Sequence, residues 1–335
     1  MSQVDVIVPC YNYGRFLQRC VDSVLGQDGC SVRVLVIDDC STDDSRATAE
    51  AIAARDPRVT LIAHERNRGH IATYNEGIDW VSAEYMLLLS ADDMLAPGAF
   101  ARATGLMAAH PAIALAHGRS IRFCEEAEIA AQLAPREAAE RPIRIELGAR
   151  FIRRLCERPI NTIETATAVV RTAVQKRVGG YRPELPHSGD LEMWLRLAAE
   201  GDIAELDAVQ AFTRVHGNNM HTQYVTDGLI RDYAQRAAAY RHFFAARPRP
   251  LPDQRMLEHL AVSRLGEEVY WAASNTLDAG NTERAMRLAR LAREINPAMT
   301  TSLAWMKLLG KIALGVGPAR RLGRLAGVLR ARGPS

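Results

Sequence analysis

Short apolar segments alternate with segments of helical periodicity in the first part of the chain. Segments 4–9, 32–37 and 85–89 are mainly apolar, which is typical of strands buried on both faces of a sheet. A further strand is predicted at 59–63, and helices are predicted at 16–25, from about 43 to 54, and at 67–81. Strands and helices alternate at about thirty residues per unit. The pattern therefore predicts an α/β fold with a mostly parallel sheet and right-handed crossovers.

Two of the predicted strands end in pairs of acidic residues. Asp38 and Asp39 follow the strand at 32–37, and Asp92 and Asp93 follow the strand at 85–89 after Ser90 and Ala91. The carboxyl ends of parallel strands meet at one edge, so these carboxylates are expected along one rim of the sheet. Carboxylates suit a divalent cation that is also bound to phosphate. The alternative is a turn followed by a helix N-cap, because aspartate suits both.

No glycine-rich phosphate loop follows the first strand, since neither GxxxxGK[ST] nor GxGxxG is present. A phosphate-binding enzyme without such a loop can use a carboxylate-held metal instead. This favours the metal interpretation of Asp92 within a nucleotide-binding class of fold.

Seven motifs covering about residues 4–220 resemble, in the same order, those of the family 2 glycosyltransferases, which are inverting enzymes with the GT-A fold. The motifs are VIVPCYN (6–12), VIDDCSTDDS (36–45), NRGHIATYNEGI (67–78), LLLSADD (87–93), VGGYRPEL (178–185), GDLEMWLRLA (189–198) and RVHGNN (214–219). The resemblance implies a Rossmann-like GT-A catalytic domain at 1–225, its sheet flanked by helices, and a C-terminal α-helical region at 226–335. It also implies transfer of a sugar from a nucleotide-sugar donor, such as a UDP-sugar, to a hydroxyl acceptor in bacterial surface or capsular polysaccharide or glycoconjugate synthesis.

On the donor side, the resemblance assigns roles to the strand ends and the turns that follow them. Asp39, with Asp38 beside it, would hydrogen-bond the base and the ribose. Asp92 would ligate a Mg²⁺ or Mn²⁺ ion that bridges the diphosphate. His216 would be a second metal ligand, and its imidazole suits Mn²⁺ better than Mg²⁺. The other donor contacts implied are Pro9, Tyr11, Asn12, Asn67, Gly69, Asn75, Ser90, Ala91 and Arg214, with Arg214 facing the diphosphate.

On the acceptor side, Asp190 matches the acidic position that the family uses as general base. An inverting transfer needs a carboxylate to take the proton of the acceptor hydroxyl. Trp194 lies about one helical turn further on the same face, whereas Glu192 lies about 200° around the helix axis and faces elsewhere. The alternative for Asp190 is structural, because Ser188-Gly189-Asp190 before an amphipathic segment is also a good helix start.

The chain departs from the family pattern at two positions. Ser90 stands where the DxD motif has its first acid, and Gly189 stands where the usual Glu-Asp pair has its glutamate. A serine hydroxyl can hydrogen-bond the donor but is a poor metal ligand. We therefore expect a metal held more weakly, or one that Asp93 helps to hold.

The C-terminal part is predicted to be helical from residue 229, with a proline-rich break at 248–252 and helices at 257–276 and 282–294. From residue 297 onward there are seven basic residues and no acidic one, which leaves a net charge of −4 on the first 296 residues. Segment 303–332 combines these basic residues with Trp305, Met306, Leu308, Leu309, Ile312 and Leu314. Such a segment is typical of an interfacial helix on anionic lipid, and the alternative is a solvated basic helix or a packing arm.

The composition limits which binding partners and which cellular location we expect. Six cysteines show no zinc-site spacing, the N-terminus lacks the pattern of a signal peptide, and no run of about eighteen apolar residues occurs. We expect a cytoplasmic protein, peripheral at the inner face of the cytoplasmic membrane through its basic tail, with a lipid-linked glycan as a fitting acceptor. Nucleic acid is a poor partner, because the positive charge is terminal and not interleaved with aromatic residues.

Two other functions fit part of this pattern. A sugar-phosphate nucleotidyltransferase shares the metal and nucleotide chemistry, but it usually has a first loop rich in Gly, Arg and Lys, whereas this chain has PCYNYGR. A non-catalytic GT-A-like binding protein would account for the two missing acids.

Overall fold

The computed structural model describes residues 1–129, 143–217, 228–245 and 251–314. The chain divides into two compact units. One, the sheet unit, comprises Met1–Arg153 and Ile160–Thr222, and the other, the helical unit, comprises Arg154–Pro159 and Gln223–Ser335.

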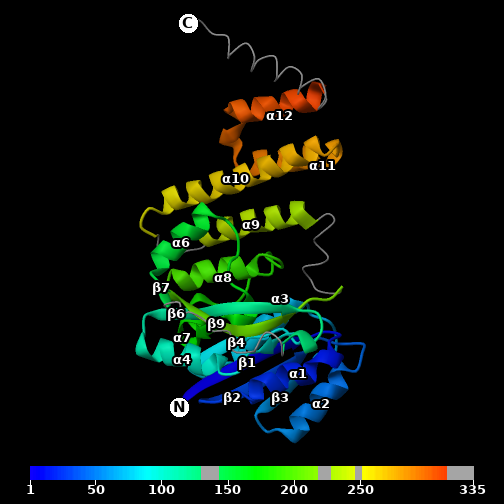
Figure 1. Cartoon of the computed structure of the whole chain (residues 1–335), viewed down its shortest axis with the longest axis vertical. Helices are drawn as coiled ribbons and strands as arrows, with labels where there is room; N and C mark the ends of the chain where they lie inside the picture. The colour runs from blue at the N-terminus through cyan, green and yellow to red at the C-terminus, as the bar shows by residue number, and fades with distance from the viewer. Residues whose placement is uncertain (130–142, 218–227, 246–250, 315–335) are drawn as a thin grey trace, which may run out of the picture. The chain divides into compact units, whose positions relative to one another are not determined.

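The first half of the sheet is parallel, as the sequence predicts. Its strands are β1 (Ser2–Cys10), β2 (Cys30–Asp38), β3 (Val59–Ala63) and β4 (Tyr85–Leu88), in the spatial order β3-β2-β1-β4 (Figure 1). The connecting helices are α1 (Gly14–Leu25), α2 (Ser45–Arg55) and α3 (His70–Trp80). The carboxyl ends of β1, β2 and β4 therefore meet at one edge, where the acidic pairs follow β2 and β4.

The second half of the sheet is mixed. Its strands are β5 (Met94–Leu95), β6 (Ile113–Phe123), β7 (Arg144–Glu146), β8 (Val169–Arg171) and β9 (Asp202–Arg214). Strand β8 pairs antiparallel with both β4 and β6, and β6 pairs parallel with β9, which also pairs with β5 and β7. The helices of this half are α4 (Ala99–Ala109), α6 (Gly148–Glu157), the 3₁₀ helix η1 (Thr165–Thr167), α7 (Thr172–Val178) and α8 (Gly189–Ala198).

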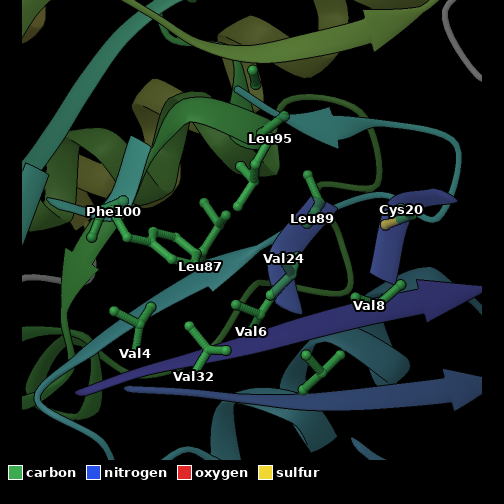
Figure 2. Close-up of a cluster of buried hydrophobic side chains, with 14 of the residues drawn as sticks. Val4, Val6, Val8, Cys20, Val24, Val32, Leu87, Leu89, Leu95 and Phe100 are labelled. Atoms are coloured by element: carbon green, nitrogen blue, oxygen red, sulfur yellow. The ribbon is translucent and has the colours of Figure 1, made fainter. Parts of the chain in front are cut away.

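Strand β1 is buried on both faces. Val4, Val6 and Val8 belong to one cluster of buried side chains with Leu87 of β4 and Val24 of α1 (Figure 2). Ile7 points to the other face, where α3 crosses so closely that a Cβ at Gly77 would lie 2.3 Å from Ile7 Cγ2. Each such aliphatic side chain contributes about 1.5–3 kcal/mol on burial, so this strand fixes the centre of the fold.

An ion pair between the buried Asp5 and the half-exposed Arg33 holds the beginning of the sheet together. Asp5 is completely buried and accepts hydrogen bonds from Arg33 Nε (2.8 Å) and Nη2 (2.7 Å), and from the backbone amides of Ser82 (2.7 Å) and Ala83 (2.8 Å). Burial alone would raise the pKa of Asp5, but these hydrogen bonds hold it below its ordinary value. Asp5 thereby ties β1 to β2 and to the segment before β4.

The helical unit has a core of its own. It contains α9 (Gly228–Ala245), α10 (Gln254–Asp278), α11 (Thr282–Ile295), the 3₁₀ helix η3 (Pro297–Thr301) and α12 (Leu303–Leu314). Helices α10 and α11 lie side by side (Figure 1), and Trp305 and Leu308 of α12 are buried against them. The sequence prediction for the basic tail beyond residue 314 lies outside the described residues. Within the described residues, none of the helices has the length and apolarity needed to span a bilayer.

Candidate active site

A cavity of about 180 Å³ lies where the ends of β1 and β4 approach η1, α8 and β9. Pockets for drug-sized ligands measure about 300–1,000 Å³, so this cavity suits the reacting part of a substrate rather than a whole nucleotide sugar. Three of the residues predicted for the site, Pro9, Ser90 and Asp190, line it together. The complete lining is Pro9, Tyr74, Leu88, Ser90, Asp93, Glu164, Thr165, Ala166, Asp190 and Thr213.

The two predicted metal ligands lie next to each other. His216 Nε2 is 3.0 Å from Asp92 Oδ2, and the Ser90 hydroxyl hydrogen-bonds Asp92 Oδ1. The His216 ring stacks on Phe16, with ring centroids 5.4 Å apart, and meets Tyr13 edge-on. A carboxylate and an imidazole so close together are a donor pair that fits a divalent first-row metal.

The protein supplies few ligands at this point. Among the described residues, no group of three or more His, Cys, Asp or Glu side chains could hold a metal ion. A cation held by Asp92 and His216 would need further oxygen ligands, which the phosphates of a nucleotide and water provide in many enzymes.

Arg214 and Asp93 lie beside Asp92 and His216. The amide of Arg214 donates to Asp93 Oδ1 (3.0 Å), and its Nε donates to the carbonyl of Asp92 (3.3 Å). The guanidinium lies over the rings of Phe16 and Phe123, 4.4 and 4.5 Å from their centroids. Burial and the adjacent Asp92 raise the pKa of Asp93 well above its ordinary value.

Asp190 lies in the first turn of α8 and points into the cavity. Its Oδ2 accepts a hydrogen bond from Thr165 Oγ1 (2.7 Å), and the Tyr181 side chain lies near the same carboxylate. Loss of water around the carboxylate raises the pKa of Asp190, while these two neighbours oppose the rise. Asp190 therefore combines the helix-start position with direct access to the cavity.

The neighbours of Asp190 on α8 have other contacts. Glu192 is buried and pairs with Arg182 and Arg196 at 2.8 Å each, so it faces away from the cavity as the helical spacing predicts. Trp194, which shares a helix face with Asp190 in the sequence prediction, is also buried and is not among the residues that line the cavity.

The acidic pair after β2 is engaged by the loop that precedes α3. Asp39 accepts hydrogen bonds from the amides of Arg68 (2.7 Å) and Gly69 (2.9 Å), and its Oδ1 is 2.7 Å from Nδ1 of His64. Asp38 Oδ2 accepts weakly from the amide of Ser41 (3.4 Å). Its Oδ1 is buried without a hydrogen-bond partner among the described residues, which is costly unless a ligand donor meets it.

Several predicted donor contacts use their polar groups on the protein itself. Asn12 has a positive φ of 59° and accepts from the amide of Thr42 (2.8 Å). Asn67 donates to the carbonyl of Asp39 (3.2 Å), while Asn75 holds both backbone groups of Tyr181.

The remaining predicted donor contacts, Gly69, Ala91 and Tyr11, differ in backbone conformation and in exposure. Gly69 has a φ of 79°, a conformation that favours glycine, at the start of α3. The Ala91 side chain belongs to the core cluster, so only its backbone is available to a ligand. Tyr11 is 47% exposed.

Sequence reasoning missed three features of this site. Glu164 and Thr165 lie in an irregular segment that carries no periodic pattern. Tyr181 lies in a recognised motif, but nothing in the motif indicates contact with Asp190. His64 directly follows β3 at the same edge of the sheet as the acidic pairs, so its position at a strand end could have identified it.

The family model for glycosyl transferase family 2 matches residues 5–175. These residues contain the parallel half of the sheet, the acidic pairs and η1. The chain therefore belongs to glycosyl transferase family 2.

Individual relatives agree with this assignment. The succinoglycan biosynthesis protein ExoO of Rhizobium meliloti is 37% identical over 138 residues, which are 39% of this chain and 39% of that protein. The matched part spans well under half of the first curated relatives, 39% of ExoO and 31% of the glycosyltransferase GlyG of Streptococcus pneumoniae.

Solved structures share the fold over nearly the whole chain. TarS 1–349 of S. aureus in complex with UDP-GlcNAc has a TM-score of 0.58 at 17% identity, covering 93% of this chain and 92% of that one. The mannosyltransferase PcManGT from Pyrobaculum calidifontis, in complex with GDP-Man and Mn²⁺, has a TM-score of 0.55 at 18% identity, covering 98% and 85%. The predicted α/β GT-A fold with a C-terminal helical region is confirmed.

Proposed function

We propose that this chain is an inverting glycosyltransferase that moves a sugar from a nucleotide-sugar donor to an acceptor hydroxyl. The observation that carries the proposal is that Asp190 lines one cavity together with Ser90 and Asp93, which follow β4. A base and a diphosphate-binding edge that share one cavity are the two parts that such a transfer needs. Residues 1–225 form the catalytic domain in this proposal, and 226–335 form the helical region.

The edge of the sheet binds the donor. Asp39 and the unpartnered oxygen of Asp38 accept hydrogen bonds from the base and ribose, beside the turn formed by Pro9, Tyr11 and Asn12. Asn67, Gly69 and Asn75 shape this pocket through their backbone contacts, and Ser90 and Ala91 border the sugar phosphate. Arg214, held between two aromatic rings, faces the diphosphate.

Asp92 and His216 hold a divalent metal, with Mn²⁺ favoured over Mg²⁺ by the imidazole. Their closeness in the structure supports the pairing, and a neighbour of the same fold was solved with Mn²⁺. When bound, the metal would neutralise negative charge on the departing nucleoside diphosphate.

Asp190 acts on the acceptor. Its carboxylate takes the proton of the acceptor hydroxyl as that oxygen bonds to C1 of the sugar, on the face opposite the nucleoside diphosphate. The bond between C1 and the diphosphate oxygen breaks in the same displacement, which inverts the anomeric centre. A pKa above the ordinary value for aspartate makes the carboxylate a stronger base.

The test is an assay with a panel of UDP-, GDP-, dTDP- and CMP-sugars, with and without Mn²⁺, that measures release of the nucleoside phosphate. Asp190→Asn should lower turnover with a matched acceptor by about 10²–10⁴-fold while nucleotide binding is kept. Full transferase activity in this variant would refute Asp190 as the base. Pyrophosphate release from a sugar phosphate and a nucleoside triphosphate would instead identify a nucleotidyltransferase, and donor binding without turnover would indicate a non-catalytic protein.

The acceptor in this proposal is a lipid-linked glycan in the synthesis of a bacterial surface polysaccharide or glycoconjugate. The name of the relative ExoO, a succinoglycan biosynthesis protein, supports this setting. We place the protein in the cytoplasm, peripheral at the inner face of the membrane. Part of α12 supports this, because Leu303, Met306 and Leu309 are 80%, 59% and 43% exposed.

A further inference from the structure

Two hydroxyl groups from separate parts of the sheet unit converge on the carboxylate of Asp190. Thr165 belongs to η1 and donates to Asp190 Oδ2 at 2.7 Å. Tyr181 belongs to the connection between α7 and α8, and its side chain lies near enough to Asp190 to lower the pKa of that carboxyl group. Neither residue follows Asp190 along its helix, so the carboxylate is held from outside α8.

Tyr181 is itself fixed by the side-chain amide of Asn75 in α3. Asn75 Oδ1 accepts from the Tyr181 amide (2.6 Å), and Asn75 Nδ2 donates to the Tyr181 carbonyl (2.9 Å). Glycines on either side allow this approach. A Cβ at Gly180 would lie 2.3 Å from Asn75 Oδ1, and one at Gly189 would lie 3.0 Å from the Tyr181 ring.

The backbone around Tyr181 is anchored from α8. Arg196 donates to the carbonyls of Val178 (2.6 Å) and Gly180 (2.8 Å), and the buried carboxylate of Glu192 holds Arg196 in place at 2.8 Å. Tyr181 is 6% exposed, and its ring packs edge-on against Tyr74, with centroids 5.5 Å apart. Tyr181 therefore has little freedom to move its hydroxyl away from Asp190.

We propose that Thr165 and Tyr181 are positioning residues for the transfer reaction, which fix the carboxylate of Asp190 through their hydroxyl groups, and that Asn75 sets Tyr181 for this task. The inference rests on the proposed function, in which Asp190 is the general base. Two donors on one carboxylate restrict its rotation and leave its remaining lone pairs for the acceptor hydroxyl. Small displacements of a catalytic group lower reaction rates strongly.

The same hydrogen bonds affect the charge state of Asp190. They favour the carboxylate, as does the nearby His70, whereas removal from water and the neighbouring Glu164 favour the protonated acid. Tyr74 also faces Asp190. Loss of one hydroxyl donor therefore raises the pKa of Asp190, and the acid limb of the pH–rate profile moves to higher pH.

The test compares Thr165→Val and Tyr181→Phe with the wild type over a pH series of kcat/KM. Each variant should shift the acid limb upward by about one pH unit and lower kcat by about tenfold. Thr165→Ser keeps the hydroxyl group and should therefore show the acid limb and the kcat of the wild type. Asn75→Ala should shift the limb in the same direction and add little to Tyr181→Phe, because both act on one contact. Thr172→Val and Tyr270→Phe, which alter a hydroxyl outside the site, serve as matched controls and should leave the profile unchanged.

A second readout does not depend on activity. Protein labelled with ¹³C at the aspartate carboxyl carbons is titrated by NMR, and Asp190→Asn assigns the signal. Its midpoint should rise in Thr165→Val and in Tyr181→Phe. If neither the midpoint nor the acid limb moves, the positioning role is overturned. If the midpoint moves but the wild type transfers no sugar from any donor, the contacts stand and the proposed function fails.

Discussion

His64 is a buried side chain that helps to orient Asp39, a residue of the motif at 36–45. It is 7% exposed and lies between two carboxylates, with Nδ1 2.7 Å from Asp39 and Nε2 2.9 Å from Glu76. Arg68 Nη1 pairs with the same Glu76 at 2.6 Å. Asp39 receives two backbone amides in addition, so it presents a fixed direction for its remaining lone pairs.

We predict that His64→Ala weakens donor binding without slowing the chemical step. The substitution removes one of the three groups that orient Asp39, which contacts the nucleoside rather than the reacting carbon in the proposed function. KM for the donor should rise by about tenfold, which corresponds to about 1.4 kcal/mol, with kcat little changed. Nucleotide binding by calorimetry and steady-state kinetics measure the two effects separately. His110→Ala, at an exposed position after α4, is the control, and a fall in kcat at unchanged KM would contradict the assignment.

The order of motifs identifies which segments meet at the edge of the sheet, but not where each side chain points. Asp92 and His216 are distant in sequence and lie together as expected. Asn12 lies in the turn after β1, Asn67 lies just before α3 and Asn75 lies within α3, yet the side-chain amides of all three bond to backbone groups of the protein. That choice depends on neighbours that only the folded chain brings into contact.

At the scale of elements, two close contacts fix the parallel half of the sheet. Helix α3 approaches β1 at Gly77, and the Asp5–Arg33 pair joins β1 to β2. The sequence predicted these strands and helices because their apolar patterns are long. It did not predict the mixed half of the sheet, since β5 and β8 are only two and three residues long and their pairing depends on distant β9 and β6.

We predict that Gly77→Ala destabilises the protein by about 1–2 kcal/mol. The new methyl group would lie 2.3 Å from Ile7 Cγ2, and overpacking of this kind costs about 1–3 kcal/mol. A gain of about 0.5–1 kcal/mol from better helix propensity offsets part of the cost. The matched control is Gly105→Ala in α4, where a Cβ meets nothing within 4 Å, and this variant should be slightly stabilised. Urea unfolding of both variants gives the comparison, and equal midpoints would argue against the close packing of α3 on β1.

We predict that Arg33→Met destabilises the protein at neutral pH and much less in acid. The variant leaves Asp5 buried with only its backbone donors, at a cost of about 2–3 kcal/mol, because Arg33 is itself half exposed. The folded-state pKa of Asp5 lies below its ordinary value, so its contribution is full above the unfolded pKa near 4 and is lost as pH falls through the folded pKa.

The difference in unfolding free energy between wild type and Arg33→Met should therefore shrink as the pH is lowered below about 4. Chemical unfolding across a pH series measures it. Arg46→Met, which removes an exposed pair with Glu50, should change stability by less than about 0.5 kcal/mol at every pH. A difference for Arg33→Met that does not depend on pH would show that the residue acts through packing alone.

At the scale of the whole molecule, charge and apolar surface are unevenly divided along the chain. The first 296 residues carry a net charge of −4, and the remainder carries +7. The sequence placed six apolar residues of the last segment on one amphipathic helix. The structure describes the burial of five of them, and these five divide into residues packed in the core and residues exposed to solvent. Trp305 and Leu308 lie in the core of the helical unit and Ile312 packs against it, whereas Met306 and Leu309 are exposed.

Lys311 also has an internal role, because its ammonium group lies 2.9 Å from the carboxylate of Asp278. This pair uses one of the positive charges that the sequence assigned to a lipid surface. The exposed residues of α12 include Leu303, Met306 and Leu309, with Lys307 among them. If the helix lies on a membrane, these residues make the contact.

We therefore predict that the full chain sediments with vesicles containing anionic phospholipid and that Met306→Glu combined with Leu309→Glu lowers this binding by about tenfold. The substitutions place two charges where apolar side chains would enter the lipid interface, and they also repel an anionic surface. Met256→Glu combined with Met286→Glu, at exposed positions of α10 and α11, adds the same charge elsewhere and is the matched control. Binding should weaken as salt is raised, because part of the attraction is electrostatic. If both double variants bind equally, there is no basis for a lipid-facing side of α12. If the wild type binds neutral vesicles as well as anionic ones, the basic residues add no electrostatic attraction.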